Sequence, residues 1–226
     1  MSLVERAAFG AGGAEPYARA LRSAHSEVYL QESIFGTHSP VATMNVARWS
    51  ADADAADLSL LHSVTGPVLD IGCGPGRMVR AAMDAGIAAM GIDVSPTAIE
   101  IASAAGLSVM LGSVFDRLPA EGHWQTTLLV DGNIGIGGDV DAMLARCREL
   151  LAPDGEIVVE THPDAGADRT FTGRLVDTLG FESASFPWAE IGLGPLVVRA
   201  SRHGLEERQS WMIDGRTFCR LAAIRR

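Results

Sequence analysis

The sequence predicts an α/β protein with a seven-stranded, mostly parallel sheet and helices on both of its faces. Between residues 67 and 160, short apolar runs alternate with capped stretches, and strands that alternate with helices indicate a parallel sheet. Near the end of the chain, residues 205–213 and 216–224 flank Asp214-Gly215, a dipeptide typical of a β-hairpin. An antiparallel pair is therefore expected at the edge of the parallel sheet.

The parallel strands are assigned to short apolar runs. Residues 67–72 contain Val68, Leu69 and Ile71, which suit a buried parallel strand. The other parallel strands are expected, in chain order, at residues 88–93, 107–112, 126–130 and 157–160.

The helices are expected where capping residues and glycine stops bracket the stretches between strands. Ser95-Pro96 is an N-cap and first-turn pair, Asp139 or Asp141 can cap a later helix, and Gly86 is a helix stop. The resulting helices are expected at about residues 76–85, 96–105, 139–151 and 190–203.

Two regions lie outside this alternating pattern. Residues 1–62 contain helix-like stretches near 14–32 and 40–62, so a helical N-terminal cap or lid is expected ahead of a core at residues 63–226. Residues 163–190 predict a β-hairpin inserted into that core. Pockets in open α/β sheets lie outside the carboxyl ends of the strands, where such additions can form a lid. We therefore expect these two regions to hold the substrate.

Composition excludes several classes of function. Of 226 residues, 47% are hydrophobic and 20% are charged, as in an ordinary globular chain. A net charge of −10 argues against broad binding to nucleic-acid phosphates, and no apolar run approaches the roughly 18 residues of a membrane span. All 18 basic residues are arginine, so the chain cannot use a Schiff-base lysine, a P-loop lysine or a lysine nucleophile.

The N-terminal residues and the cysteines bear on the cellular compartment. Residues 1–6 lack a basic stretch followed by an apolar one, so we expect no secretory signal. Cys73, Cys147 and Cys219 are odd in number and widely spaced, which fits a reducing compartment and no metal-ligand pattern. A cytoplasmic protein without a metal site is expected, and no pattern indicates an oligomeric state.

Residues 67–76, Pro-Val-Leu-Asp-Ile-Gly-Cys-Gly-Pro-Gly, form the most informative stretch of the chain. Gly72, Gly74 and Gly76 remove side chains where the first strand must turn into a helix. Glycine permits tight backbone angles and lets a ligand approach the main chain closely, and the helix N-terminus offers free N–H groups. The loop therefore predicts a site for a nucleotide-type cofactor.

The glycine spacing bears on which cofactor binds. A dinucleotide fingerprint that starts at Gly72 needs its last glycine at position 77, which is Arg77. Asp70 lies two residues before Gly72, and Asp93 ends the second strand, where an acid suits hydrogen bonds to a ribose diol. Arg77 thus disfavours an NAD-type oxidoreductase, which stays open as an alternative.

These residues resemble two motifs of the class I S-adenosylmethionine-dependent methyltransferases, which have a Rossmann-like fold. Residues 68–76 resemble the first motif of that family, and residues 91–95, Gly-Ile-Asp-Val-Ser, resemble its acidic second-strand motif. The resemblance covers about residues 63–162. It implies transfer of a methyl group from S-adenosyl-L-methionine to a small-molecule acceptor through an oxygen, nitrogen, sulfur or carbon nucleophile. A non-catalytic domain that binds the same cofactor is the second alternative.

The resemblance also implies roles for residues at the strand ends. The glycine loop would hold the methionine part of the cofactor, Asp93 the ribose hydroxyls, and Val94 would pack against the adenine. Many relatives place an Asp after the third strand to meet the adenine amino group, whereas this chain has Ser113 there. The implied cofactor-binding residues are Asp70, Gly72, Cys73, Gly74, Gly76, Asp93, Val94, Ser113, Val114 and Asp131.

Candidates for the transfer step follow the fourth and fifth strands. Asp131 and Asn133 are an acid and an amide beside the expected methyl group, where they could orient a nucleophile. His162 closes the fifth strand and could act as a general base, since its free pKa is near neutrality. Each has a plain alternative as a turn or surface residue. Further candidates, by position in the two additional regions alone, are Tyr17, Tyr29, His38 and Trp188.

Overall fold

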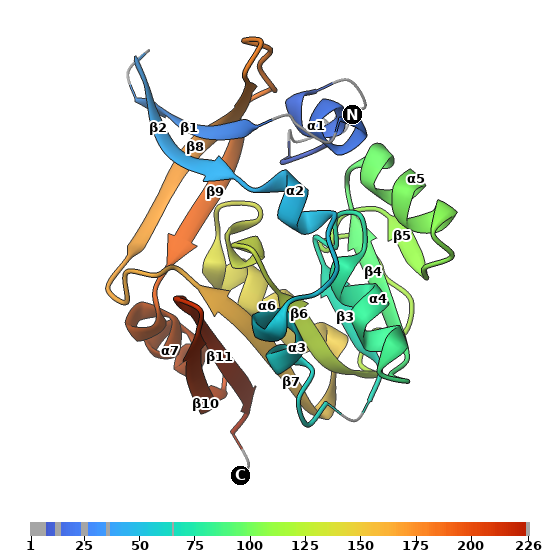
Figure 1. Cartoon of the computed structure of the whole chain (residues 1–226). Helices are drawn as coiled ribbons and strands as arrows, with labels where there is room; N and C mark the ends of the chain where they lie inside the picture. Colours follow the sequence, from blue (N-terminus) through green and yellow to red (C-terminus); the bar gives the residue numbers. More distant parts are fainter. Residues whose placement is uncertain (1–7, 12–14, 24–26, 35–36, 65, 225–226) are drawn as a thin grey trace, which may run out of the picture.

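The computed structural model describes residues 8–11, 15–23, 27–34, 37–64 and 66–224, the side chains of residues 33–41 excepted. Its strands form two sheets, one of seven strands and one of four (Figure 1). No helix in the described part of the chain combines the length and apolar character that a membrane crossing requires.

The larger sheet has the strand order β10-β11-β7-β6-β3-β4-β5. Five of its strands, β3 to β7, are parallel, and β11 pairs antiparallel with both β7 and β10. The predicted parallel sheet with a C-terminal antiparallel hairpin is therefore confirmed. Its strands are β3 (Val68–Ile71), β4 (Ala89–Asp93), β5 (Val109–Leu111), β6 (Trp124–Leu129), β7 (Leu151–Thr161), β10 (Leu205–Ile213) and β11 (Arg216–Ala223).

Helices cover both faces of this sheet, as expected. One face packs on α6 and α7 and the other on α3 and α4, while α5 packs against β4 and β5. β3 is buried on both sides: Leu69 and Ile71 face one core and Val68 the other, because successive side chains of a strand alternate. The helices are α3 (Ala55–Leu60), α4 (Arg77–Asp84), α5 (Pro96–Ala104), α6 (Val140–Leu150) and α7 (Leu193–Arg202).

The smaller sheet corrects one expectation about the N-terminal region. Residues 28–44, expected to be largely helical, form the antiparallel strands β1 (Val28–Ile34) and β2 (Thr37–Met44). They join the expected insertion hairpin, β8 (Asp168–Asp177) and β9 (Phe186–Ile191), in the order β2-β1-β8-β9. In the described part of this region, helical structure is limited to α1 (Pro16–Arg22), α2 (Val46–Trp49) and α3.

The physical reason for this correction is a distant partner. β1 pairs with β8, from Val28 opposite Asp177 to Glu32 opposite Gly173, so its strand conformation depends on residues far along the chain. Val28 and Leu30 are buried in a third core, whereas Tyr29 between them is half-buried. Such alternation over three residues is too short to identify a strand from sequence.

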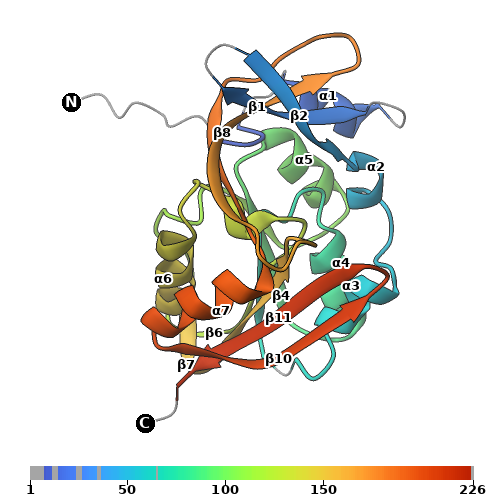
Figure 2. The same ribbon diagram turned by 90° about the vertical axis from the view of Figure 1, so that its left-hand side faces the viewer.

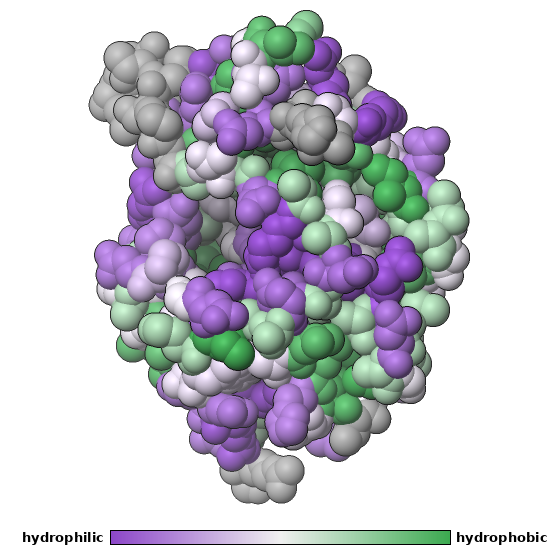
Figure 3. Space-filling model, viewed as in Figure 1, coloured by the Kyte–Doolittle hydropathy of each residue, from purple (hydrophilic) through white to green (hydrophobic). Residues whose placement is uncertain are grey.

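The smaller sheet lies over the carboxyl ends of the parallel strands (Figures 1 and 2). Contact between the two sheets runs through β9, which packs on a 3₁₀ turn (Asn133–Gly135) after β6 and forms a bridge from Trp188 to Ile136. On the face shown in Figure 3, hydrophilic residues gather across the middle, at the level of α2 and α3 in Figure 1. The smaller sheet and the carboxyl ends of the parallel strands enclose a cavity between them.

Candidate functional site

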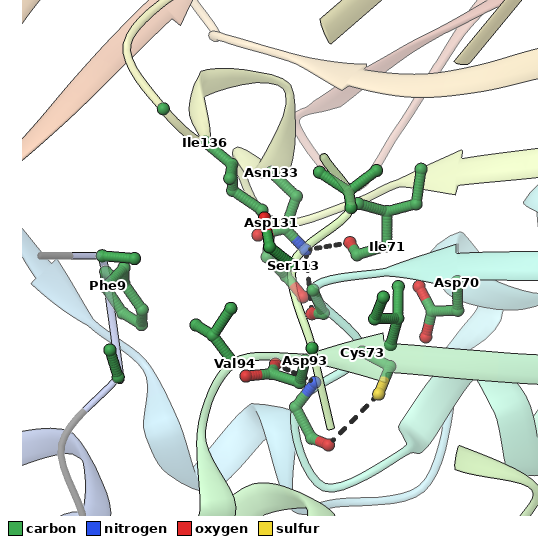
Figure 4. A pocket seen from close by; sticks show the side chains of 18 of the residues that line it. Phe9, Asp70, Ile71, Cys73, Asp93, Val94, Ser113, Asp131, Asn133 and Ile136 are labelled. Atoms are coloured by element: carbon green, nitrogen blue, oxygen red, sulfur yellow. Dashed lines mark hydrogen bonds between the residues drawn. The ribbon is translucent and has the colours of Figure 1, made fainter. Parts of the chain in front are cut away.

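A cavity of about 920 Å³ lies at the carboxyl ends of the parallel strands. Its floor is the glycine loop after β3 together with the ends of β4, β5 and β6, and its opposite wall comes from the N-terminal region and β9 (Figure 4). This volume is at the upper end of the range for ligand pockets, about 300–1,000 Å³. The cavity is thus large enough for a nucleotide-type cofactor with further space beyond it.

The three loop glycines have different functions. Gly72, Gly74 and Gly76 all have positive φ angles, of 72°, 55° and 92°, which glycine adopts without strain. A Cβ on Gly72 would lie 2.6 Å from Nδ2 of Asn133, and one on Gly76 would lie 2.4 Å from Cδ1 of Leu107. Among the described residues, a Cβ on Gly74 would meet only the Tyr17 hydroxyl, at 3.1 Å. Gly72 and Gly76 are required by packing, whereas the space beside Gly74 is part of the cavity.

Asn133 holds the glycine loop in place. Its side-chain amide donates hydrogen bonds to the carbonyl oxygens of Ile71, at 2.9 Å, and Gly72, at 3.0 Å (Figure 4). Asp131 and Gly132, just before the 3₁₀ turn, have positive φ angles of 55° and 85° and turn the chain back toward the loop. The structure thus brings this predicted site residue to the cavity, with its amide bound to the main chain.

Asp93 is oriented by two backbone donors. One carboxylate oxygen accepts the N–H of Gly74 and the other accepts the N–H of Ser95, both at 2.8 Å. Burial raises the pKa of this carboxyl, and the N–H donors oppose that rise. Each oxygen keeps a second lone pair, so the carboxylate can accept hydrogen bonds from two neighbouring hydroxyl groups of a ligand.

The residues that follow Asp93 and β5 complete this end of the cavity. Val94 and Ser113 both line it (Figure 4), and Val114 beside them is buried. Ser113 is held in a turn, because its hydroxyl accepts the N–H of Phe115 while its own N–H donates to the Asp116 carboxylate. An apolar side chain and a small polar one therefore line this end of the cavity.

Asp70 is a buried acid without a hydrogen-bond donor among the residues that the structure describes. It lines the cavity from β3 and is 3% exposed. Burial raises its pKa to about 7; the Arg77 charge opposes this rise, and Asp131 and Asp93 add to it. A buried carboxylate that faces a cavity favours a cationic group of a ligand, because that group would offset its desolvation.

Asp131 belongs to an ionic cluster that joins distant segments of the chain. Its carboxylate lies 2.7 Å from Arg48 and 2.5 Å from Arg77. Asp57, which is fully buried, lies 2.9 Å from Arg48, 3.3 Å from Arg77 and 2.8 Å from Arg216. Because both oxygens of Asp131 are engaged by guanidinium groups, the carboxylate positions the loop and α4 and is not a free base.

A second cavity, of about 380 Å³, lies beside the first and contains His162. Nδ1 of His162 accepts the N–H of Asp164 at 3.1 Å, and Nε2 lies 3.7 Å from a Glu190 oxygen. The structure does not place His162 on the wall of the larger cavity. The two cavities share the wall residues Met44, Trp49, Asp131 and Trp188.

The four further candidates also differ in whether they line the larger cavity. Tyr17 and Trp188 line the larger cavity, whereas Tyr29 donates a hydrogen bond to Glu27 and lines neither cavity described above. The side chain of His38 lies outside the described residues. Sequence reasoning missed Phe9 and Trp49 on the cavity wall, because isolated aromatic residues are more typical of core packing.

Comparisons with known proteins agree with this geometry. Residues 68–155 match a family model described as a methyltransferase domain. No curated protein sequence matches the chain.

Several solved structures have the same fold. An S-adenosylmethionine-dependent methyltransferase from Bacteroides fragilis, solved with S-adenosyl-L-homocysteine, is 19% identical with a TM-score of 0.72, over 92% of this chain and 93% of that one. The 1,6-didemethyltoxoflavin-N1-methyltransferase from Burkholderia thailandensis, solved with 1,6-didemethyltoxoflavin and S-adenosylhomocysteine, is 17% identical with a TM-score of 0.57, over 76% and 78%. The glycopeptide N-methyltransferase MtfA, complexed with S-adenosylmethionine, is 13% identical with a TM-score of 0.59, over 77% and 95%.

Proposed function

We propose that the chain, in which residues 68–155 match a methyltransferase domain, is an S-adenosylmethionine-dependent enzyme of the class I, Rossmann-like kind, and that it methylates a small-molecule acceptor. The observation that carries the acceptor class is the cavity of about 920 Å³, which extends from the glycine loop to the wall formed by the smaller sheet and the N-terminal region. A compartment covered in this way suits a small ligand better than a macromolecule. The 1,6-didemethyltoxoflavin bound to the Burkholderia enzyme is such a ligand.

The residues of the cavity fit S-adenosylmethionine. We propose that Asp70 binds the ammonium of the methionine part, that Asp93 accepts hydrogen bonds from the ribose hydroxyls, and that Val94 and Ser113 flank the adenine. The Asp70 carboxyl, which has no hydrogen-bond donor in the described part of the chain, supports the first assignment, and the free lone pairs of Asp93 support the second. When bound, the cofactor supplies an electrophilic methyl group.

We propose that the protein promotes transfer chiefly by positioning. Asn133 and Asp131 would keep the glycine loop and α4 in place, so that an acceptor bound in the same cavity meets the methyl group in line. Well-oriented groups can reach effective molarities of about 10⁵–10⁸ M, so a dedicated base is not required for an acceptor that already presents a lone pair. His162 lines the second cavity and not the larger one, so we propose that it does not act at the methyl group.

Two additional assignments complete the proposal. We assign the described parts of residues 1–62 and the hairpin at about 163–190 to one cap over the acceptor, which the pairing of β1 with β8 supports. We assign the chain to the cytoplasm, which its three free, buried cysteines support.

Calorimetric titration with S-adenosylhomocysteine tests the cofactor assignment. Asp93→Ala removes the carboxylate that accepts the diol, and we expect the affinity to fall at least tenfold, about 1.4 kcal/mol. Asp84→Ala, at the exposed end of α4, is the matched control and should bind normally. Unchanged affinity in Asp93→Ala would overturn the ribose assignment.

The two alternatives are tested by turnover and by a second cofactor. Incubation with S-adenosylmethionine and a panel of small acceptors should produce S-adenosylhomocysteine, whereas a non-catalytic binding domain would bind the cofactor and produce none. A fluorescence titration with NADH should show no saturable binding. Saturable binding of NADH would instead support an oxidoreductase.

A further inference from the structure

Five aromatic side chains meet on the side of the cavity that faces the glycine loop. Phe9 is at their centre, with ring centroids 5.3 Å from Tyr17, 6.2 Å from Trp49, 5.5 Å from Phe186 and 5.5 Å from Trp188. All but Phe186 line the cavity, and Figure 4 shows Phe9 across the hollow from Asn133 and Ile136. These rings come from the N-terminal region and β9, outside the parallel core. We call these five residues the aromatic wall.

Three polar groups of the aromatic wall have no hydrogen-bond partner among the described residues. They are the indole N–H groups of Trp49 and Trp188 and the hydroxyl of Tyr17, although Tyr17 is only 3% and Trp188 only 6% exposed. Elsewhere the indole groups are paired: Trp124 donates to the carbonyl of Pro119 and Trp211 donates to the hydroxyl of Ser59. Buried Tyr and Trp usually find a partner for the polar group. Since all three side chains line the cavity, a ligand can supply the missing acceptors.

The charge of the cavity limits what that ligand can be. Arg77 is the only basic side chain on the described wall of the larger cavity, and Asp131 and Asp57 already neutralise it. The acidic side chains on this wall are Asp70, Asp93, Asp116, Asp131 and Asp139. A carboxylate or phosphate on the acceptor would therefore be repelled and would find no free cation among the described residues.

We propose that the aromatic wall binds the methyl acceptor, and that the acceptor is a planar aromatic molecule with neutral hydrogen-bond acceptors and no negative charge. This inference rests on the proposed methyltransferase function and names its substrate class. Flat rings are complementary to the aromatic wall, against which offset or edge-to-face contacts are favourable. The indole N–H groups of Trp49 and Trp188 donate to a carbonyl or ring nitrogen of the acceptor. Tyr17, whose hydroxyl reaches Gly74, lies at the border between acceptor and cofactor.

Three matched probes test the substrate class. Quinolin-2-one is flat, neutral and carries a carbonyl; decahydroquinolin-2-one keeps the carbonyl but is not flat; 2-oxoquinoline-4-carboxylate is flat but anionic. Binding of each is measured by calorimetry and saturation-transfer NMR on the full chain with saturating S-adenosylhomocysteine. We expect quinolin-2-one to bind at least tenfold more tightly than either of the others. Equal affinities, or no binding of quinolin-2-one, would overturn the inference.

Variants place the probe at the aromatic wall. Trp188→Leu should weaken quinolin-2-one binding at least tenfold and leave the affinity for S-adenosylhomocysteine within about twofold. Trp49→Leu, at a half-buried position, serves if Trp188→Leu does not fold, as judged by circular dichroism. Phe181→Leu is the matched control, because Phe181 is 50% exposed and lines neither cavity described above. Quinolin-2-one binding that both Trp variants retain would contradict the assigned site.

The same measurements separate this inference from the proposed function. A chain that binds S-adenosylhomocysteine but shows no preference for the flat probe keeps the proposed function and loses the inference. A chain that binds quinolin-2-one at Trp188 but no S-adenosylhomocysteine loses the proposed function, and the aromatic wall is then a binding site of another kind.

Discussion

Asp70 shows how a single residue links stability to ligand binding. The fold buries its carboxyl beside the cavity and raises the pKa from its ordinary 3.8 to about 7, mainly through burial. Because the folded pKa exceeds the unfolded one, ionisation of Asp70 destabilises the ligand-free fold. This destabilisation is absent below about pH 4 and complete above about pH 7, and each pKa unit corresponds to about 1.4 kcal/mol.

The pH dependence of cofactor affinity follows from this shift. Binding of an ammonium requires ionised Asp70, so we expect the affinity for S-adenosylhomocysteine to rise from about pH 6 to about pH 8. Calorimetry in the two buffers measures this rise, and Asp70→Asn should abolish it. The same variant should raise the melting temperature at about pH 8 but not at about pH 4. A rise in affinity that persists in Asp70→Asn would contradict the assignment, and Asp84→Asn is the control.

At the scale of elements, the glycine loop and the 3₁₀ turn act as one unit. The loop leaves β3 with positive φ at Gly72 and Gly74, and the amide of Asn133 fixes it by two hydrogen bonds to the main chain. The loop in turn presents the N–H of Gly74 to Asp93 on β4. The ends of three parallel strands are thereby held in register around one ligand site.

Gly74→Val should eliminate S-adenosylhomocysteine binding while the chain stays folded. The valine side chain would fill the open side of the cavity, where the Tyr17 hydroxyl is the one described group near the added Cβ. Gly86→Val is a close control, because Gly86 also has a positive φ, of 75°, but no described atom lies within 4 Å of its added Cβ. Both variants suffer backbone strain of about 1–3 kcal/mol, so melting temperatures should fall alike. Normal binding by folded Gly74→Val would show that the loop does not hold the cofactor.

At the scale of the whole molecule, the ionic cluster around Asp57 joins parts that the sheets alone leave separate. Asp57 on α3 meets Arg48 after β2, Arg77 at the start of α4 and Arg216 at the start of β11. Arg216 also binds Glu160 at the end of β7. One buried carboxylate thus connects the N-terminal region, α4 and the C-terminal hairpin.

Asp57→Ala should destabilise the fold by about 3–5 kcal/mol, since it leaves partly buried arginines without their shared partner. Denaturant unfolding measures this loss. Glu206→Ala serves as the control, because Glu206 and its partner Arg208 are both about two-fifths exposed, and exposed pairs contribute about 0–1 kcal/mol. A loss in Asp57→Ala no larger than in Glu206→Ala would show that the cluster does not stabilise the fold.

The parallel core and its glycine loop were predictable because their signals are local. Apolar runs, caps and the loop glycines lie within a few residues of the elements that they define, and Asp139 does cap α6. β1 and β2 were not predictable, because β1 is completed by β8. Of the helix-like residues 14–32, those that the structure describes contain one helix, α1.

The residues of the candidate site also differ in whether a local sequence signal identifies them. Asp70, Asp93 and Gly74 follow from motif position, whereas the contacts of Asp131 and Asn133 depend on tertiary placement. Nothing local marks the aromatic wall, which gathers rings from four separate segments: residues 8–11, α1, α2 and β9.

The pairing of β1 with β8 has a consequence for the order of events during synthesis. The central strand pair of the smaller sheet, β1 with β8, can form only after Asp177 has been translated, because Asp177 is the partner of Val28. Until then β1 can pair only with β2, and an isolated two-stranded hairpin is only marginally stable in water. Closure of so long a loop is slow compared with local pairing. The nascent N-terminal strands therefore stay available to chaperones or to wrong pairings until most of the chain has emerged. The cover of the cavity is therefore completed only after the five parallel strands beneath it have been synthesised.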